Sequence, residues 1–183
     1  IPQNDNGDHF AMRDYHVLSM AEVGGEVKEH GVALSVDQVP WAGRQMWAPD
    51  AATKDGQYYL YFPLKDKQDI FRIGVATSDS PVGPFVPEPE PMAGSFSMDP
   101  AVFADDDQQH YLFFGGIWGG QLQRWTKGEY SQQDDYPADD APALMPKAVK
   151  LSDDMLSMDG EPQDIMILDE SGQPIKQGDL DRR

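Results

Sequence analysis

The sequence contains no cysteine among its 183 residues. It can therefore form neither disulfides nor thiolate metal sites, but secreted and cytosolic chains alike can lack cysteine, so the compartment stays unknown. Basic residues are also few, because 14 Lys and Arg stand against 32 Asp and Glu, for a formal net charge of -18. Nucleic acids and anionic lipid surfaces are held mainly by Lys and Arg, so we expect no nucleic-acid partner and no membrane partner.

Long apolar runs and several familiar motifs are missing as well. No stretch could span a bilayer, and no charged-then-apolar leader opens the numbered chain, which we therefore expect to be soluble. There is no His-x-x-x-His pair, no Gly-x-Ser-x-Gly elbow and no phosphate-binding glycine loop, so zinc hydrolysis, serine-esterase chemistry and nucleotide binding have no support. Short apolar runs broken by Gly, Pro, Asp and Ser, without a helical period, predict an all-β fold.

What the sequence does contain is a pattern written twice. Residues 47–52 and 97–103 are short apolar segments, and each is followed by an acidic turn and an aromatic segment, at 58–62 and 111–114. A repeat of about this period, built from short strands, is typical of four-stranded propeller blades. A second pattern consists of a strand, a polar turn and an outer strand, and it occurs three times. It indicates three blade endings, whereas the first pattern indicates only two blade beginnings.

These patterns predict a partial β-propeller over residues 1–183, with the end of one blade and about two complete blades. The expected parts are the end of a first blade (1–40), a second blade (41–92), a third blade (93–170) with a long surface loop (127–147), and a connection to a missing blade (171–183).

Two acidic residues occupy nearly equivalent positions at the starts of the two predicted innermost strands. Such strands begin around one axis, so Asp99 and Asp50 are expected to face a shared central pocket. The register differs, because Pro precedes Asp50 and follows Asp99. We therefore expect Asp50 to lie one residue deeper, where it can accept hydrogen bonds from backbone N–H groups, and Trp47 to lie on the rim.

Strand direction predicts which loops border this pocket. The second strand of a blade returns toward the starting face, so residues 115–120 are expected to open beside Asp99, and residues 63–69 beside Trp47. Trp118 lies between glycines in the first loop and offers a flat apolar surface with one N–H donor, which suits a sugar ring. The alternative interpretations are a Trp that fills a gap between blades and an Asp that caps a turn.

Several motifs in order carry a family resemblance. Trp47-Ala48-Pro49-Asp50, the segment 73–85 and Met98-Asp99-Pro100 together resemble the family 43 glycoside hydrolases of the β-xylosidase and α-L-arabinofuranosidase type, as a partial chain covering about residues 14–168. The resemblance implies a five-bladed propeller and an inverting hydrolase that cleaves xylo- or arabino-configured bonds in oligosaccharides derived from hemicellulose.

The resemblance also implies roles for individual residues. Such enzymes use an Asp as general base, a Glu as general acid, and a third carboxylate that tunes and orients the acid; the inverting pair stands roughly 6.5 to 9.5 Å apart. Asp99 matches the third carboxylate, and Trp47 matches a position in the wall of the sugar pocket. Trp118 and Asp50 complete the expected substrate-binding set.

The expected base and acid are both missing from the chain. The family's base lies on the first inner strand, before this chain begins, and its acid lies in a Glu-Gly-Pro context at the fourth blade. Glu161 follows Gly160 and precedes Pro162, in a predicted blade ending, so it is not expected to be the acid. We expect the chain alone to be inactive. Its open blade faces favour association with a complementary chain or a second copy.

Two other classes of protein stay open at this point. One is a carbohydrate-binding propeller without catalysis, and the other is a propeller scaffold for protein partners. No cofactor is expected to be required, and no residue is assigned as a metal ligand, although a structural divalent ion such as calcium occurs in some family members. The sequence does not identify the sugar or the linkage.

Overall fold

The computed structural model describes residues 10–180, and this range contains strands and short 3₁₀ helices but no α-helix. The all-β prediction is confirmed. The strands are β1 (Asp14–Ser19), β2 (Lys28–Ser35), β3 (Ala42–Arg44), β4 (Asp50–Lys54), β5 (Gln57–Asp66), β6 (Phe71–Ser78), β7 (Val86–Pro87), β8 (Ala101–Ala104), β9 (His110–Phe114), β10 (Lys147–Lys150) and β11 (Gln163–Asp164). The 3₁₀ helices are η1 (Val36–Gln38), η2 (Trp118–Gly120), η3 (Leu122–Arg124) and η4 (Gln177–Asp179).

The strands form three antiparallel sheets in chain order. Strands β1 and β2 make a two-stranded pair, while β8, β9, β10 and β11 form a four-stranded meander. In the middle sheet, β5 pairs with β6 along one edge and with β4 and β3 along the other, and β7 extends the sheet beyond β6. The meanders β4–β7 and β8–β11, preceded by a shorter sheet, are the arrangement expected of neighbouring propeller blades, and β3 is a fifth strand added to the first of them.

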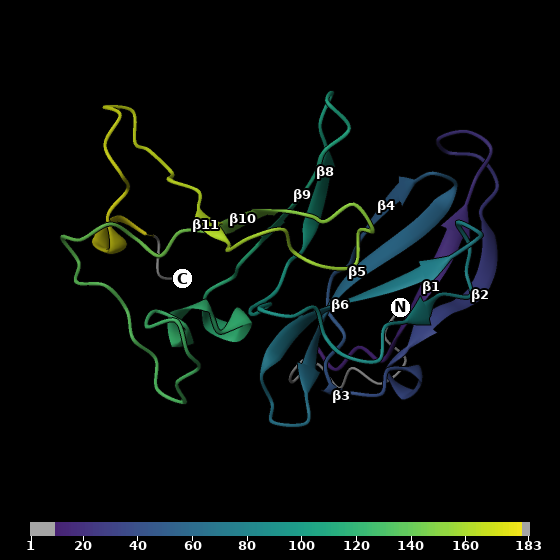
Figure 1. Cartoon of the computed structure of the whole chain (residues 1–183), viewed down its shortest axis with the longest axis horizontal. Helices are drawn as coiled ribbons and strands as arrows, with labels where there is room; N and C mark the ends of the chain where they lie inside the picture. The colour runs from purple at the N-terminus through teal and green to yellow at the C-terminus, as the bar shows by residue number, and fades with distance from the viewer. Residues whose placement is uncertain (1–9, 181–183) are drawn as a thin grey trace.

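Strand β5 explains how the sheets stack. Successive side chains of a strand point to opposite faces. Leu60, Phe62 and Leu64 join the buried cluster shared with the β1–β2 sheet. Tyr59 and Tyr61 join the other cluster, which is shared with β9 and β10. The middle sheet is therefore buried on both faces, and Figure 1 shows it between the other two.

Strand β5 of the middle sheet is longer than its sequence suggests. Proline disfavours the interior of a sheet, which would end the strand near Phe62, yet β5 continues through Pro63 to Asp66. The edge of β5 at Pro63 lies between the segments paired with β4 and β3, where the backbone N–H of Trp47 donates to the Pro63 carbonyl at 3.0 Å. Proline has no N–H group with which to return a hydrogen bond to the Trp47 carbonyl. The Tyr15 hydroxyl donates to that carbonyl instead.

The long excursion of the last sheet lies between its second and third strands, β9 and β10, and not between the third and fourth as the sequence pattern predicts, because β10 begins only after the excursion ends. After η2 and η3, no named strand occurs until Lys147, and Figure 1 shows this green segment extending away from the sheets. Arg124 and Thr126 tie it back through Asp134 and Asp135, at 2.8 Å in each case. Within residues 10–180, no helix has the length and apolar character needed to cross a membrane.

Candidate functional site

Asp50 opens β4 and is half-buried. Its Oδ2 accepts a hydrogen bond of 2.7 Å from the backbone N–H of Val102 on β8. The expected acceptor role is therefore present, and its partner belongs to the next sheet. This bond brings the innermost strands of two successive sheets together at the point where both begin.

Asp99 lies two residues before β8 and has a left-handed backbone, with φ at 56°. Asp and Asn tolerate this region better than most residues. Although the residue is exposed overall, burial on one side raises the pKa of its carboxyl group above the ordinary value, because desolvation disfavours the charged form. The carboxylate Oδ2 stands 3.5 Å from the point where a Cβ at Gly116 would lie, so Asp99 borders the loop 115–120 as expected.

A compact set of contacts holds that loop against the segment before Asp99. The buried Ser97 hydroxyl accepts from the Gly116 N–H at 2.8 Å and lies 3.1 Å from the Gly116 carbonyl. The Gly115 N–H donates to the Met98 carbonyl at 2.8 Å. A Cβ at Gly116 or Gly120 would stand 2.5 or 2.7 Å from the Met98 Cε atom, so the Met98 side chain would have to move to admit one.

Trp47 is held on several sides. Its indole Nε1–H donates to the Phe10 carbonyl at 2.8 Å. Its ring packs against Phe71, with centroids 4.6 Å apart, and against Phe10 edge-on at 6.5 Å. A Cβ at Gly119 would lie 3.1 Å from the ring, so Trp47 directly contacts the loop 115–120. Trp47 and Asp99 therefore border one loop from two successive sheets.

Trp118 lies at the start of η2 in that same loop. Its side chain is 54% exposed and its φ is 55°, which is unusual for a bulky residue. In the described chain it does not fill a buried gap. Strained backbone of this kind often occurs at ligand sites, where the surrounding structure maintains it.

Sequence reasoning missed the residues that fasten these elements together. Ser97 clamps the loop, Phe71 supports the Trp47 ring, and the buried Gln121 joins the loop to the middle sheet. None of the three carries a local signal, because Ser, Phe and Gln are common in strands and turns. Their roles depend on partners 19 to 50 residues away in the chain.

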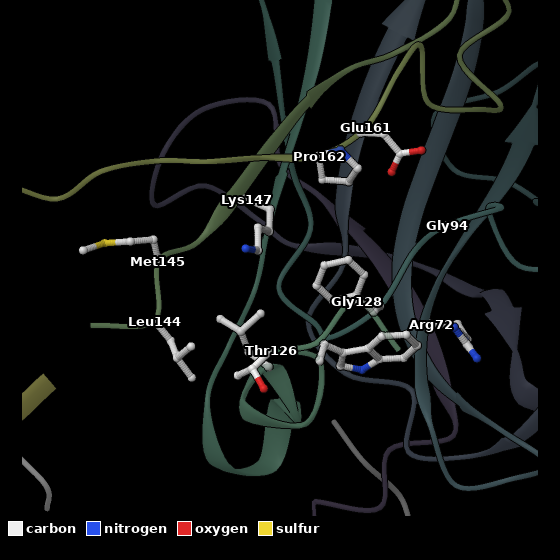
Figure 2. A pocket seen from close by; sticks show the side chains of 12 residues that line it. Arg72, Gly94, Thr126, Gly128, Leu144, Met145, Lys147, Glu161 and Pro162 are labelled. Atoms are coloured by element: carbon white, nitrogen blue, oxygen red, sulfur yellow. The ribbon is translucent and has the colours of Figure 1, made fainter. Parts of the chain in front are cut away.

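Glu161 lies away from this set. It lines a separate cavity of about 420 Å³ together with Arg72, Lys147 and Pro162, and Asp99 and Trp47 are not among the described lining residues (Figure 2). The Arg72 guanidinium lies 5.0 Å from the Trp125 ring, which also lines this cavity. The described residues contain no cluster of three or more His, Asp or Glu side chains that could hold a metal ion.

Comparisons with known proteins identify the class to which this propeller belongs. The family model described as "Glycosyl hydrolases family 43" matches residues 27–169. The chain therefore belongs to glycosyl hydrolase family 43, whose enzymes are five-bladed β-propellers. It supplies the end of one blade and about two complete blades of that fold.

Individual relatives agree with this assignment. The chain is 54% identical to a xylosidase/arabinosidase of Bacteroides ovatus and 53% identical to xylosidase/arabinosidase 43A of Humicola insolens, over 100% of this chain in both cases. The crystal structure of CoXyl43, a β-xylosidase/α-arabinofuranosidase from a compost microbial metagenome with bound xylotriose in a calcium-free form, matches with a TM-score of 0.92 and 64% identity over the whole chain. A family enzyme of Xanthomonas citri with xylotriose matches with a TM-score of 0.91 and 53% identity over 96% of this chain.

The chain covers only part of the length of each relative. The chain spans 57% and 59% of the two xylosidase/arabinosidases, and 56% and 53% of the two solved chains. Activity of the whole protein must therefore be argued from more than the residues present here.

Proposed function

We propose that the protein containing this chain is an inverting glycoside hydrolase that removes xylo- or arabino-configured sugars from oligosaccharides of hemicellulose. The observation that carries the proposal is the shared loop: Asp99, whose carboxyl pKa is raised, and the Trp47 ring both border residues 115–120. A carboxyl group beside an aromatic wall can tune a neighbouring acid that protonates the leaving group of a sugar held on that wall.

Within this proposal, Asp99 acts as the third carboxylate, and it tunes and orients a general acid supplied by a blade outside this chain. Trp47 and Trp118 wall the sugar, whose C–H faces pack well on aromatic rings. Asp50 is committed to the Val102 N–H, so it shapes the pocket by holding β4 against β8. No cofactor is needed for this chemistry, because two carboxylates and water suffice. A structural calcium ion is compatible with this chemistry but takes no part in it.

The xylotriose complexes of two close relatives favour a xylo-configured ligand. The sugar is neutral, and a chain with a formal charge of -18 is suited to such a substrate better than to an anionic one.

The test compares the 183-residue chain with the full-length protein that contains it. The full-length protein should release xylose or arabinose from aryl glycosides, and the chain alone should not. In the full-length protein, Asp99→Asn should lower kcat about 100-fold, in the range typical of a lost acid–base contribution, and should shift the limb of the pH profile that reports the general acid. Turnover by the chain alone, or an unchanged pH profile in Asp99→Asn, would refute these assignments.

Association of the chain is a second consequence of the proposal. Phe103 on β8 is 53% exposed, on a strand that another blade or a second copy would cover. We expect the isolated chain to self-associate in light scattering after size exclusion, and the full-length protein to be less associated at equal concentration. A chain that stays monomeric at high concentration would argue against this expectation.

A further inference from the structure

Gln121 is the buried residue whose contacts the proposed chemistry does not explain. It is only 4% exposed and adopts a left-handed backbone, with φ at 66°, between η2 and η3. Its backbone N–H donates to the Trp118 carbonyl at 3.0 Å. A long polar side chain is costly to bury unless its amide is satisfied, so its partners indicate what it does.

Both ends of the Gln121 amide bind backbone groups of the middle sheet. Its Oε1 accepts from the Phe71 N–H at 2.9 Å, and its Nε2 donates to the Asp69 carbonyl at 2.9 Å. These two groups lie on either side of Ile70, at the end of the turn where β5 passes into β6. The side chain thus pairs with the end of this hairpin as a neighbouring backbone amide would.

Gln121 connects the hairpin that packs against Trp47 to the loop that carries Trp118, and these are the two indoles proposed to contact the sugar. On one side, the ring of Phe71 packs against Trp47 at 4.6 Å. On the other side, Gln121 is hydrogen-bonded to the backbone of Trp118. The loop also approaches the Trp47 ring at Gly119, so a small displacement of the hairpin would change the relative positions of the two indoles.

We infer that Gln121 is a positioning residue whose side-chain amide sets the placement of the Trp47 ring relative to the Trp118 ring, and thereby the width of the sugar pocket. The contacts alone support the effect of Gln121 on the two rings, whereas its effect on the sugar pocket rests on the proposed function. A misplacement of about 1 Å in such a site can cost about 100-fold in rate or affinity.

The experiment uses the full-length protein labelled with 5-fluorotryptophan, whose ¹⁹F resonances are assigned by single Trp→Phe variants. Gln121→Met keeps the length of the side chain and removes its hydrogen bonds. It should move the resonances of Trp47 and Trp118 and leave that of Trp41, which lies in the cluster shared with the β1–β2 sheet. Gln68→Met makes the same change at an exposed position of the same hairpin and should move none of them.

Kinetics on the same variants connect ring placement to sugar binding. Gln121→Met should raise KM for a xylo-oligosaccharide by about 10- to 100-fold, with a smaller change in kcat, because ring placement affects binding more than proton transfer. Gln68→Met should leave both constants unchanged.

Gln121→Glu separates a hydrogen-bonding role from simple filling of space. Its ionised carboxylate would face the Asp69 carbonyl, but the protonated acid can donate to that carbonyl and still accept from the Phe71 N–H. Burial raises the pKa of such a group, so lowering the pH should return both ¹⁹F resonances toward their original positions. Gln121→Met should show no such return.

Each outcome decides one part of the inference. Unmoved Trp47 and Trp118 resonances in Gln121→Met overturn the positioning role. Moved resonances with unchanged KM leave that role standing and overturn the assignment of the two indoles to the sugar pocket. If Gln121→Met does not fold, the pH-dependent return in Gln121→Glu supports the positioning role, and its absence overturns it.

Discussion

The carboxylate of Asp50 and the backbone N–H of Val102 are 2.7 Å apart and join the innermost strands of two successive sheets. The two residues are 52 positions apart in sequence, close to the spacing of the repeated pattern. A carboxylate that accepts from a backbone amide forms a charge-assisted bond, which is stronger than a bond between neutral groups. The relationship makes Asp50 a link between two successive sheets.

Removal of this link should cost stability. Asp50→Ala leaves the half-buried Val102 N–H without its partner, and we expect a loss of about 1–3 kcal/mol in the free energy of unfolding, measured with urea. Asp50→Asn keeps a carbonyl oxygen that can accept, so its loss should be smaller. Asp79→Ala, at an exposed position after β6, serves as the control and should change little. Equal losses in Asp50→Ala and Asp79→Ala would show that the bond does not stabilise the fold.

The repeat alone predicts much of this arrangement. It predicts two successive meanders, without the additional strand β3 of the first, and it predicts the acceptor position of Asp50 and a glycine-bounded loop beside Asp99, because each follows from the period of the pattern and from strand direction. Gln121 and Ser97 could not be found in this way. Their partners are backbone groups of other segments, and a backbone group leaves no trace in the amino-acid sequence. The continuation of β5 through Pro63 is equally hidden in the sequence, because the Trp47 carbonyl opposite Pro63 takes its hydrogen bond from the distant Tyr15 hydroxyl.

The raised pKa of the Asp99 carboxyl group gives stability a definite dependence on pH. The folded state holds the proton more tightly than the unfolded state, because burial disfavours the charged form. The contribution of Asp99 to stability is therefore greatest below its unfolded pKa and falls as pH rises through the folded pKa. Asp99→Asn removes the free-energy cost of keeping a charged carboxylate at a desolvated position. The variant should therefore be more stable than the parent chain at neutral pH and equally stable below the unfolded pKa.

Asn is the matched replacement here because it tolerates the left-handed backbone at position 99. Alanine tolerates this backbone conformation less well, so the free energy of unfolding of Asp99→Ala should be lower than that of Asp99→Asn at every pH, by roughly 1 kcal/mol. Thermal unfolding across acid and neutral pH measures both effects. If the stability difference between Asp99→Asn and the parent chain did not vary with pH, the carboxyl group would not be desolvated in solution.

The packing of Met98 beneath the loop predicts a coupling between two positions. Gly120→Ala would place a Cβ 2.7 Å from both the Cε and Cγ atoms of Met98, and such overpacking should cost about 1–3 kcal/mol. When Met98→Ala has already vacated the space, Gly120→Ala should cost less, with a coupling energy of about 0.5–3 kcal/mol in a double-mutant cycle. The pairing of Gly120→Ala with Met20→Ala, on an exposed residue after β1, should be additive. Additivity in both cycles would contradict the packing described here.

Trp118 allows a separation of function from stability. A bulky residue at a φ of 55° and with a side chain 54% exposed gains little from packing and carries backbone strain of about 1–2 kcal/mol. Trp118→Asn relieves that strain, because Asn tolerates the left-handed region, so unfolding free energy should stay unchanged or rise by up to about 1 kcal/mol. The same variant removes the aromatic face that the proposed function assigns to the sugar, and it should weaken xylotriose binding by the full-length protein in calorimetry.

Trp118→Phe completes this comparison, because it keeps an aromatic face and the same backbone strain. It should retain most of the affinity for xylotriose, while Trp118→Asn loses it, since the apolar face of the ring provides the contact. The opposite pattern would assign Trp118 a packing role: Trp118→Asn would then destabilise the fold by more than about 1 kcal/mol and leave sugar affinity unchanged. The strain at this position persists because the loop 115–120 is held by Ser97 on one side and by Gln121 on the other. Variants of those two residues should therefore lower sugar affinity without touching the indole itself.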